Sequence, residues 1–207
     1  MEYYGFVRHE IAPMLPAHAD RVLELGCGNG ATLAWLKANG RCNSTTGIEY
    51  SPDASSIARQ HLDHVIEGDA EQIDLQALGQ FDLILCLDVL EHLRDPWQML
   101  RKLKQQLTPQ GRIIVSVPNI RHHSILLPLL FRGQWRYQAA GILDQTHLRF
   151  FTQESAQQLL EQAGFQIEQC TGLGQQWAAS RFWRWLGKLA WAKPFCSVQY
   201  ILNGKIS

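Results

Sequence analysis

The stretch VLELGCGNG, residues 22–30, decides the fold class. Its first residues are of the apolar kind that fill a buried parallel strand, and the turn that follows carries Gly26, Gly28 and Gly30. Glycine lets the backbone approach a ligand closely, and a helix expected over Ala31–Ala38 would offer unpaired N–H groups at its first turn. The stretch therefore predicts a strand, a tight ligand-binding turn and a helix, which together begin an α/β fold.

Apolar runs and helical patterns continue to alternate along the chain, as is typical of a mostly parallel sheet. The patterns predict further strands at residues 45–50, 64–68, 81–87, 111–117, 165–170 and 198–202. They predict helices that begin at Ser51, Asp95 and Thr152, where a capping side chain precedes a helical pattern. The length of 207 residues suits one domain that spans residues 1–207.

Two aromatic segments interrupt the alternation. Residues 121–143 are rich in aromatic, Leu and Pro residues, and we expect a lid-like insertion there, because the segment follows the fifth strand at the edge where ligands bind. Residues Trp177–Trp191 carry Arg181, Arg184 and Lys188 at helical spacing, which predicts an amphipathic helix. That helix would pack on the domain, form a homodimer or make peripheral membrane contact.

Composition excludes several classes of protein. Nineteen Lys and Arg balance nineteen Asp and Glu, which gives no electrostatic reason to expect a nucleic-acid partner. Five scattered cysteines without a close pair fit neither a zinc ribbon nor a disulfide scaffold, so no metal is expected. The first residues lack the basic and apolar regions of a secretory signal, and no apolar run is long enough to span a bilayer. We therefore expect a cytoplasmic protein.

Acidic side chains follow the second, third and fourth expected strands. Glu49 lies about twenty residues after the glycine turn, where a carboxylate can accept both hydrogen bonds of a ribose diol. Asp69 follows the third strand, and Asp88, Glu91 and His92 follow the fourth. In an open α/β sheet these positions line the ligand crevice. The turn and Glu49 alone would suit a nicotinamide dinucleotide equally well.

The combined motifs resemble class I S-adenosylmethionine (SAM)-dependent methyltransferases. The resemblance covers Arg21–Asn119, with LELGCGNG at 23–30, Glu49, GDA at 68–70 and DVLEHL at 88–93 in the family's order and spacing. It implies a Rossmann-like, seven-stranded, mostly parallel sheet with helices on both faces and the last strand antiparallel. It also implies SAM as the cofactor and a small-molecule acceptor, with an activity in EC 2.1.1.

The resemblance implies a role for each matching residue. Gly26 and Gly28 would approach the methionine part of SAM, with Glu24 near its amino group. Glu49 would hold the ribose. Asp69 and Ala70 would contact the adenine. Leu87 and Asp88 would line the methionine end.

A second resemblance begins after the insertion. The stretch DQTHLRFFT, residues 144–152, is similar to a segment of ubiquinone-type O-methyltransferases and of bacterial methyltransferases associated with polysaccharide and lipid-sugar synthesis. The quinone enzymes usually carry Gly-Thr-His-Asp-Trp there, whereas this chain has Gln145, Leu148 and Arg149 around the Thr-His pair. The acceptor would be a hydroxyl on a sugar, lipid-linked or quinone-like molecule, and the departure favours the sugar.

Methylation of a hydroxyl requires a proton acceptor, and a histidine suits that task at neutral pH. Among His92, His122, His123 and His147, the last is the predicted catalytic base, because it lies in the second resembling segment. His92 is expected to be a structural or lid-contacting residue at the start of a helix. A metal site of His122, His123 and Asp144 matches no common ligand spacing. The alternative functions are an NAD-dependent oxidoreductase and a SAM-binding protein without catalysis.

Overall fold

The computed structural model describes residues 6–174, 185 and 187–206. Within them, seven strands form one sheet in the order β3-β2-β1-β4-β5-β7-β6. The strands are β1 Ala19–Leu25, β2 Cys42–Glu49, β3 His64–Glu67, β4 Phe81–Leu87, β5 Leu107–Pro118, β6 Phe165–Leu173 and β7 Gln199–Ile206. Strand β7 runs antiparallel to β5 and β6, and the remaining pairs are parallel. The expected Rossmann-like sheet with an antiparallel last strand is confirmed.

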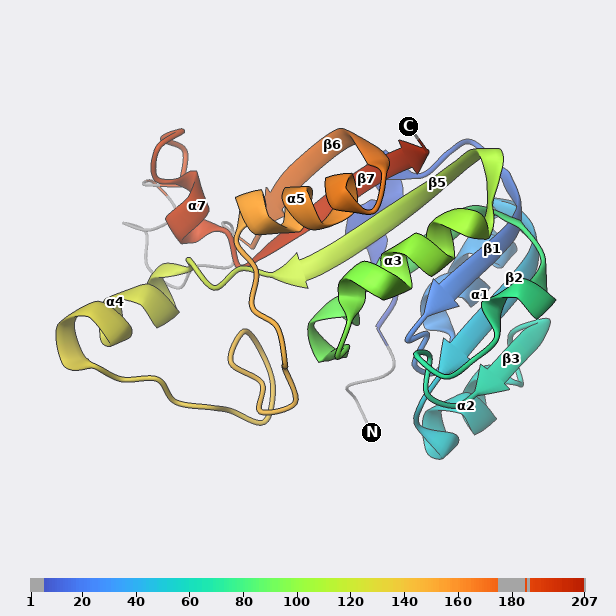
Figure 1. Ribbon diagram of the computed structural model, residues 1–207, viewed down its shortest axis with the longest axis horizontal. Coiled ribbons are helices and arrows are strands. Elements are labelled where there is room, and N and C mark those ends of the chain that lie inside the picture. Colours follow the sequence, from blue (N-terminus) through green and yellow to red (C-terminus); the bar gives the residue numbers. More distant parts are fainter. Residues whose placement is uncertain (1–5, 175–184, 186, 207) are drawn as a thin grey trace.

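Helices cover both faces of this sheet (Figure 1). The helices are α1 Ala31–Ala38, α2 Pro52–Ala58, α3 Pro96–Gln105, α4 His123–Arg132, α5 Gln153–Gln162 and α7 Lys193–Cys196, with 3-10 turns η1 His9–Met14, η2 Leu75–Leu78 and η3 Leu90–His92. Side chains of α3 and α5 share one buried cluster, and side chains of η1 and α1 share another. The carboxyl ends of the five parallel strands, β3, β2, β1, β4 and β5, thus lie along one edge of a sheet that is covered on both faces.

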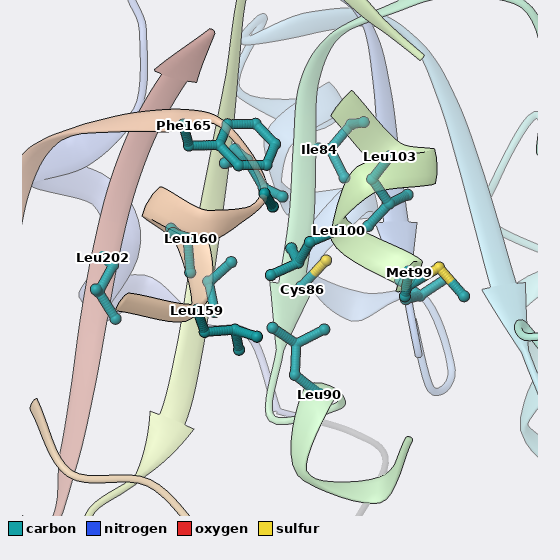
Figure 2. Close-up of a cluster of buried hydrophobic side chains, with 14 of the residues drawn as sticks. Ile84, Cys86, Leu90, Met99, Leu100, Leu103, Leu159, Leu160, Phe165 and Leu202 are labelled. Carbon is teal, nitrogen blue, oxygen red and sulfur yellow. The ribbon is translucent and has the colours of Figure 1, made fainter. Parts of the chain in front are cut away.

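Strand β4 shows why the sheet forms as predicted. Its burial is nearly complete, since successive side chains point to opposite faces and both faces are covered. Ile84 and Cys86 enter the cluster with α3 and α5, whereas Leu83 and Leu85 enter the cluster with η1 and α1. In Figure 2, Cys86 lies between side chains of α5 and side chains of α3, among them Leu100. A continuous apolar run is therefore required here.

The insertion contains a helix that its sequence did not predict. Helix α4 has no buried residue, and Leu130 and Phe131 are 69% and 75% exposed. Figure 1 shows α4 projecting beyond the sheet, while the chain that follows it returns toward the amino end of α3. Whether residues 121–143 close over a ligand stays a prediction.

Most of the amphipathic segment Trp177–Trp191 lies outside the described residues, so the homodimer and membrane-contact hypotheses remain predictions. In the part of the chain that is described, no helix is long and apolar enough to cross a membrane.

Candidate functional site

The glycine turn after β1 has the backbone geometry that a ligand cradle requires. Gly26, Gly28 and Gly30 have φ angles of 70°, 56° and 80°, in the left-handed region that disfavours side chains. A Cβ atom on Gly26 would lie 2.9 Å from Cγ2 of Val89, so the turn also packs too closely for a larger residue. The predicted turn is present, with α1 beginning directly after it.

Glu49 ties this turn to the end of β2. Its Oε2 accepts a hydrogen bond from the N–H of Gly28 at 2.8 Å, and its Oε1 accepts one from the N–H of Ser51 at 2.8 Å. The residue is only 6% exposed. Each carboxylate oxygen can accept two hydrogen bonds, so each retains one lone pair for a ribose hydroxyl. The geometry suits the role that the resemblance implies.

Glu24 has the surroundings that best suit a positively charged group. The residue is 3% exposed, and its Oε2 has no hydrogen-bond partner in the structure. Burial raises the pKa of Glu24 to about 8, against a lowering by Arg8, and Glu49 adds to the increase. An ammonium group would supply both the missing donor and a countercharge. Glu24 therefore fits the amino group of an amino-acid ligand.

Arg8 is a site residue that the sequence did not indicate. Its NH1 donates to Oδ2 of Asp88 at 2.6 Å, and its NH2 donates to Oγ of Ser116 at 3.3 Å. Oδ1 of Asp88 accepts a further bond from Oγ of Ser116 at 2.9 Å and another from Nε2 of Gln199. Asp88 has a φ of 53°, which is uncommon for a residue other than glycine. Three side chains, those of Arg8, Ser116 and Gln199, thus fix the carboxylate of Asp88 at the end of β4.

The remaining predicted cofactor residues lie at the same edge of the sheet. Asp69 follows β3, where its Oδ1 accepts from the N–H of Glu71 at 2.9 Å. Ala70 packs against the buried cluster of α3 and α5, and Leu87 ends β4 with 6% exposure. Their contacts with a bound cofactor stay predictions, because the structure fixes their position only.

A second group of side chains lies just beyond Asp88. Glu91, His92 and His147 each bring one potential ligand atom to within 4.8 Å of the others. Nε2 of His147 is 3.9 Å from Oε1 of Glu91, and the rings of His92 and His147 are 4.7 Å apart at their centroids. We call these three residues the Glu91 cluster. His92 lies in the 3-10 turn η3, not at the start of a helix as expected.

The Glu91 cluster is rich in unpaired acceptors. Glu91 is 1% exposed, and neither of its side-chain oxygens has a hydrogen-bond partner. Burial raises its pKa well above the ordinary 4.5, and the charge of Asp88 adds to this effect. Burial also lowers the pKa of His147 below 6.5, which keeps its imidazole neutral near pH 7. A buried orphan carboxyl of this kind usually has a ligand, a proton or an ion as its partner.

Two imidazoles and one carboxylate form a donor set that divalent transition metals use. The Glu91 cluster thus fits a divalent cation, although the sequence led us to expect no metal. Only the close approach of His147 to Glu91, residues far apart in the chain, brings the set together.

His122 and His123 lie in the insertion, residues 121–143, and form hydrogen bonds at the start of α4. His122 caps α4 through Nδ1, which accepts from the N–H of Ser124, and burial beside His123 lowers the pKa of His122 to about 4. Nδ1 of His123 donates to the carbonyl oxygen of Phe195 at 2.9 Å. Asp144 bonds to Thr146 instead. These contacts give the pair a structural role.

Solved structures share the fold of this chain. The chain superposes on a SAM-dependent methyltransferase from Archaeoglobus fulgidus with a TM-score of 0.66 at 18% identity, covering 96% of this chain and 91% of that one. A second, from Mesorhizobium loti, gives a TM-score of 0.66 at 18% identity, covering 94% and 95%. The fold is that of SAM-dependent methyltransferases. The profile of the methyltransferase-domain family matches residues 2–170, and the chain belongs to this family.

Relatives of known activity are similar to a large part of the chain. A ubiquinone biosynthesis O-methyltransferase from Aeromonas salmonicida is 26% identical over 159 residues, which are 74% of this chain and 66% of the relative. One from Aromatoleum aromaticum is 31% identical over 136 residues, 59% of this chain and 57% of the relative. The chain thus matches less than two thirds of the length of either relative. Its family and fold indicate SAM as the cofactor in place of a nicotinamide dinucleotide.

Proposed function

We propose that the protein is a SAM-dependent O-methyltransferase, built as one methyltransferase domain, that acts on a hydroxyl of a small acceptor. One observation carries the proposal: the Glu91 cluster of proton acceptors lies immediately beyond the expected cofactor cradle. Asp88 joins the two, because its carboxylate is held by Arg8 and its charge acts on both Glu91 and His147.

The cradle residues bind and orient SAM. Glu24 takes the amino group, Gly26 and Gly28 allow the methionine part to approach the backbone, and Glu49 takes the ribose diol. Asp69 and Ala70 contact the adenine, while Leu87 and Asp88 line the end nearest the acceptor. The orphan oxygen of Glu24 and the free lone pairs of Glu49 support these roles.

The transfer itself needs alignment and removal of one proton. Bound SAM would supply an electrophilic methyl group for the acceptor oxygen, and its sulfur would keep the electrons of the broken carbon–sulfur bond and leave as S-adenosylhomocysteine. The hydroxyl proton passes to Nε2 of His147, which acts as the general base. Nδ1 of His147 lies 3.1 Å from the carbonyl oxygen of Ile142. A carbonyl oxygen can only accept, so Nδ1 carries the proton and Nε2 carries the lone pair.

A divalent cation in the Glu91 cluster is the alternative to the base role of His147, because a nitrogen that ligates a metal has no lone pair left to accept a proton. A cation bound there would act as a Lewis acid that lowers the pKa of a coordinated hydroxyl. The two unpaired oxygens of Glu91 are the observation that favours this second role.

The relatives favour a quinone-like acceptor with an aromatic hydroxyl, since their own activity is O-methylation in ubiquinone biosynthesis. A sugar hydroxyl is the second candidate. It is supported by Leu148 and Arg149, which replace the residues usual in the quinone enzymes.

The test is transfer of an isotopically labelled methyl group from SAM, followed by mass spectrometry of the product. Prenylated catechols and nucleotide- or lipid-linked sugars serve as matched acceptor panels. We expect a methyl ether and S-adenosylhomocysteine in equal amounts. Transfer to amines alone would disprove O-methylation, and tight SAM binding without transfer to any acceptor would indicate a non-catalytic SAM-binding protein.

A further inference from the structure

Thr146 connects the Glu91 cluster to an acidic residue outside it. Its Oγ1 donates to Oδ1 of Asp144 at 2.7 Å and lies 3.1 Å from Nδ1 of His92. Its N–H also donates to Oδ1 of Asp144, at 2.8 Å. Asp144 is 5% exposed, whereas Thr146 is exposed. The three residues form a chain of hydrogen bonds that ends on an imidazole of the cluster.

The direction of each bond follows from the number of protons available. Oδ1 of Asp144 accepts from the N–H of Thr146 at 2.8 Å and from its Oγ1 at 2.7 Å, and because an N–H can only donate, this oxygen is an acceptor. The single hydroxyl proton of Thr146 goes to Asp144, so Oγ1 can only accept from His92. Nδ1 of His92 must then carry a proton, and the lone pair of the neutral ring lies on Nε2.

We propose that Asp144 and Thr146 are positioning residues that hold His92 in its Nδ1–H tautomer, so that the Nε2 lone pair is the one available to the Glu91 cluster. The proposal deepens the proposed function, because a fixed lone pair is what proton transfer or cation binding at this cluster requires. The carbonyl oxygen of Ile142 fixes the same tautomer in His147. Both imidazoles therefore present the same nitrogen.

Backbone hydrogen bonds hold Thr146 in its place beside His92. The N–H groups of Leu148 and Arg149 both donate to the backbone oxygen of Glu91, at 2.8 and 3.0 Å, so the segment that carries Thr146 is fixed against η3.

Thr146→Val tests the proposal, since it removes the acceptor while preserving side-chain shape, and Thr146→Ser is the matched control that retains a hydroxyl. Metal-free protein labelled with ¹⁵N at histidine reports the tautomer of each neutral ring by NMR, and His92→Gln identifies the His92 signals. We expect Nδ1–H in wild type and Thr146→Ser, and a mixture of tautomers in Thr146→Val. Wild-type His92 found chiefly as Nε2–H, or an unchanged tautomer in Thr146→Val, would overturn the proposal.

Titration of metal-free protein with Mn²⁺ alone gives a second measurement. Loss of a residue that orients a metal ligand typically weakens metal affinity by about 10- to 100-fold, and we expect that loss in Thr146→Val but not in Thr146→Ser. Equal Mn²⁺ affinity in Thr146→Val and wild type would contradict the positioning role. Wild type that binds no Mn²⁺ would remove the cation role proposed above, and the tautomer measurement would then decide the positioning role by itself.

Discussion

The affinity for SAM should depend on pH through Glu24. In the ligand-free protein, burial raises the pKa of this carboxyl to about 8, so at pH 7 it is mostly protonated. An ammonium partner favours the carboxylate, and binding must therefore expel a proton. At pH 7 the expected release is about 0.9 proton, and ionisation costs about 1.4 kcal/mol of binding free energy.

The direction of the pH dependence follows from the raised pKa of Glu24. Affinity should increase by about tenfold for each pH unit below 8, level off near 8, and decline where the ammonium of the ligand loses its own proton. Calorimetry with S-adenosylhomocysteine, in two buffers of different ionisation enthalpy, measures both the affinity and the proton count. Glu24→Gln should bind more weakly and show neither proton release nor the rising limb.

Wild-type affinity that is constant between pH 6 and 8, with no proton exchanged, would refute the reasoning. It would mean either that Glu24 is ionised before the ligand arrives or that the amino group binds elsewhere. A rising limb that persists in Glu24→Gln would assign the titration to another group.

Four further predictions concern the base, the cradle, the core and the insertion. His147→Gln should bind SAM as wild type does but turn over a hydroxyl acceptor about 10²- to 10⁴-fold more slowly, and near-normal turnover would leave the residue a structural role. Glu49→Ala should weaken SAM binding by about 1.5–3 kcal/mol in calorimetry, and Gly28→Val should weaken it further, because a branched side chain at φ 56° is strained. Wild-type affinity in both folded variants would place the cofactor elsewhere. Leu100→Ala, in the fully buried face of α3, should lower the free energy of unfolding by about 2–5 kcal/mol in urea titration; a loss under 1 kcal/mol would contradict tight packing there. Residues 121–143 should gain protection from hydrogen exchange when cofactor and acceptor are both bound, whereas unchanged exchange would indicate a fixed insertion.

The cofactor cradle was predictable because its signals are local. The run Phe81–Leu87 predicted β4 to the residue, since a strand covered on both faces is almost wholly apolar, with Asp82 the one polar residue in it. The prediction of a helix over Ala31–Ala38 was equally exact, because three glycines precede the helix and Asn39-Gly40 ends it. The position of Glu49 was predictable as well, because it ends the second strand and parallel strands end at a common edge of the sheet.

The Glu91 cluster depended on the tertiary structure. Glu91 and His147 come from segments with unrelated local patterns, and the sequence placed His147 on the acceptor side without giving it a partner. Arg8 and Asp88 are 80 residues apart, and nothing around Arg8 resembles a motif. Helix α4 was missed because it is apolar without a buried face, which leaves no helical periodicity to detect.

The sequence by itself therefore determined the sheet, the glycine turn, the cofactor class and the edge of the sheet at which chemistry takes place. Only the tertiary structure decided which side chains meet there: Arg8 with Asp88, His147 with Glu91, and Thr146 with His92. The physical reason is that strand periodicity and turn chemistry act over a few neighbouring residues and leave their mark in the local sequence. Contacts between distant side chains arise when the elements pack, and no local pattern encodes them.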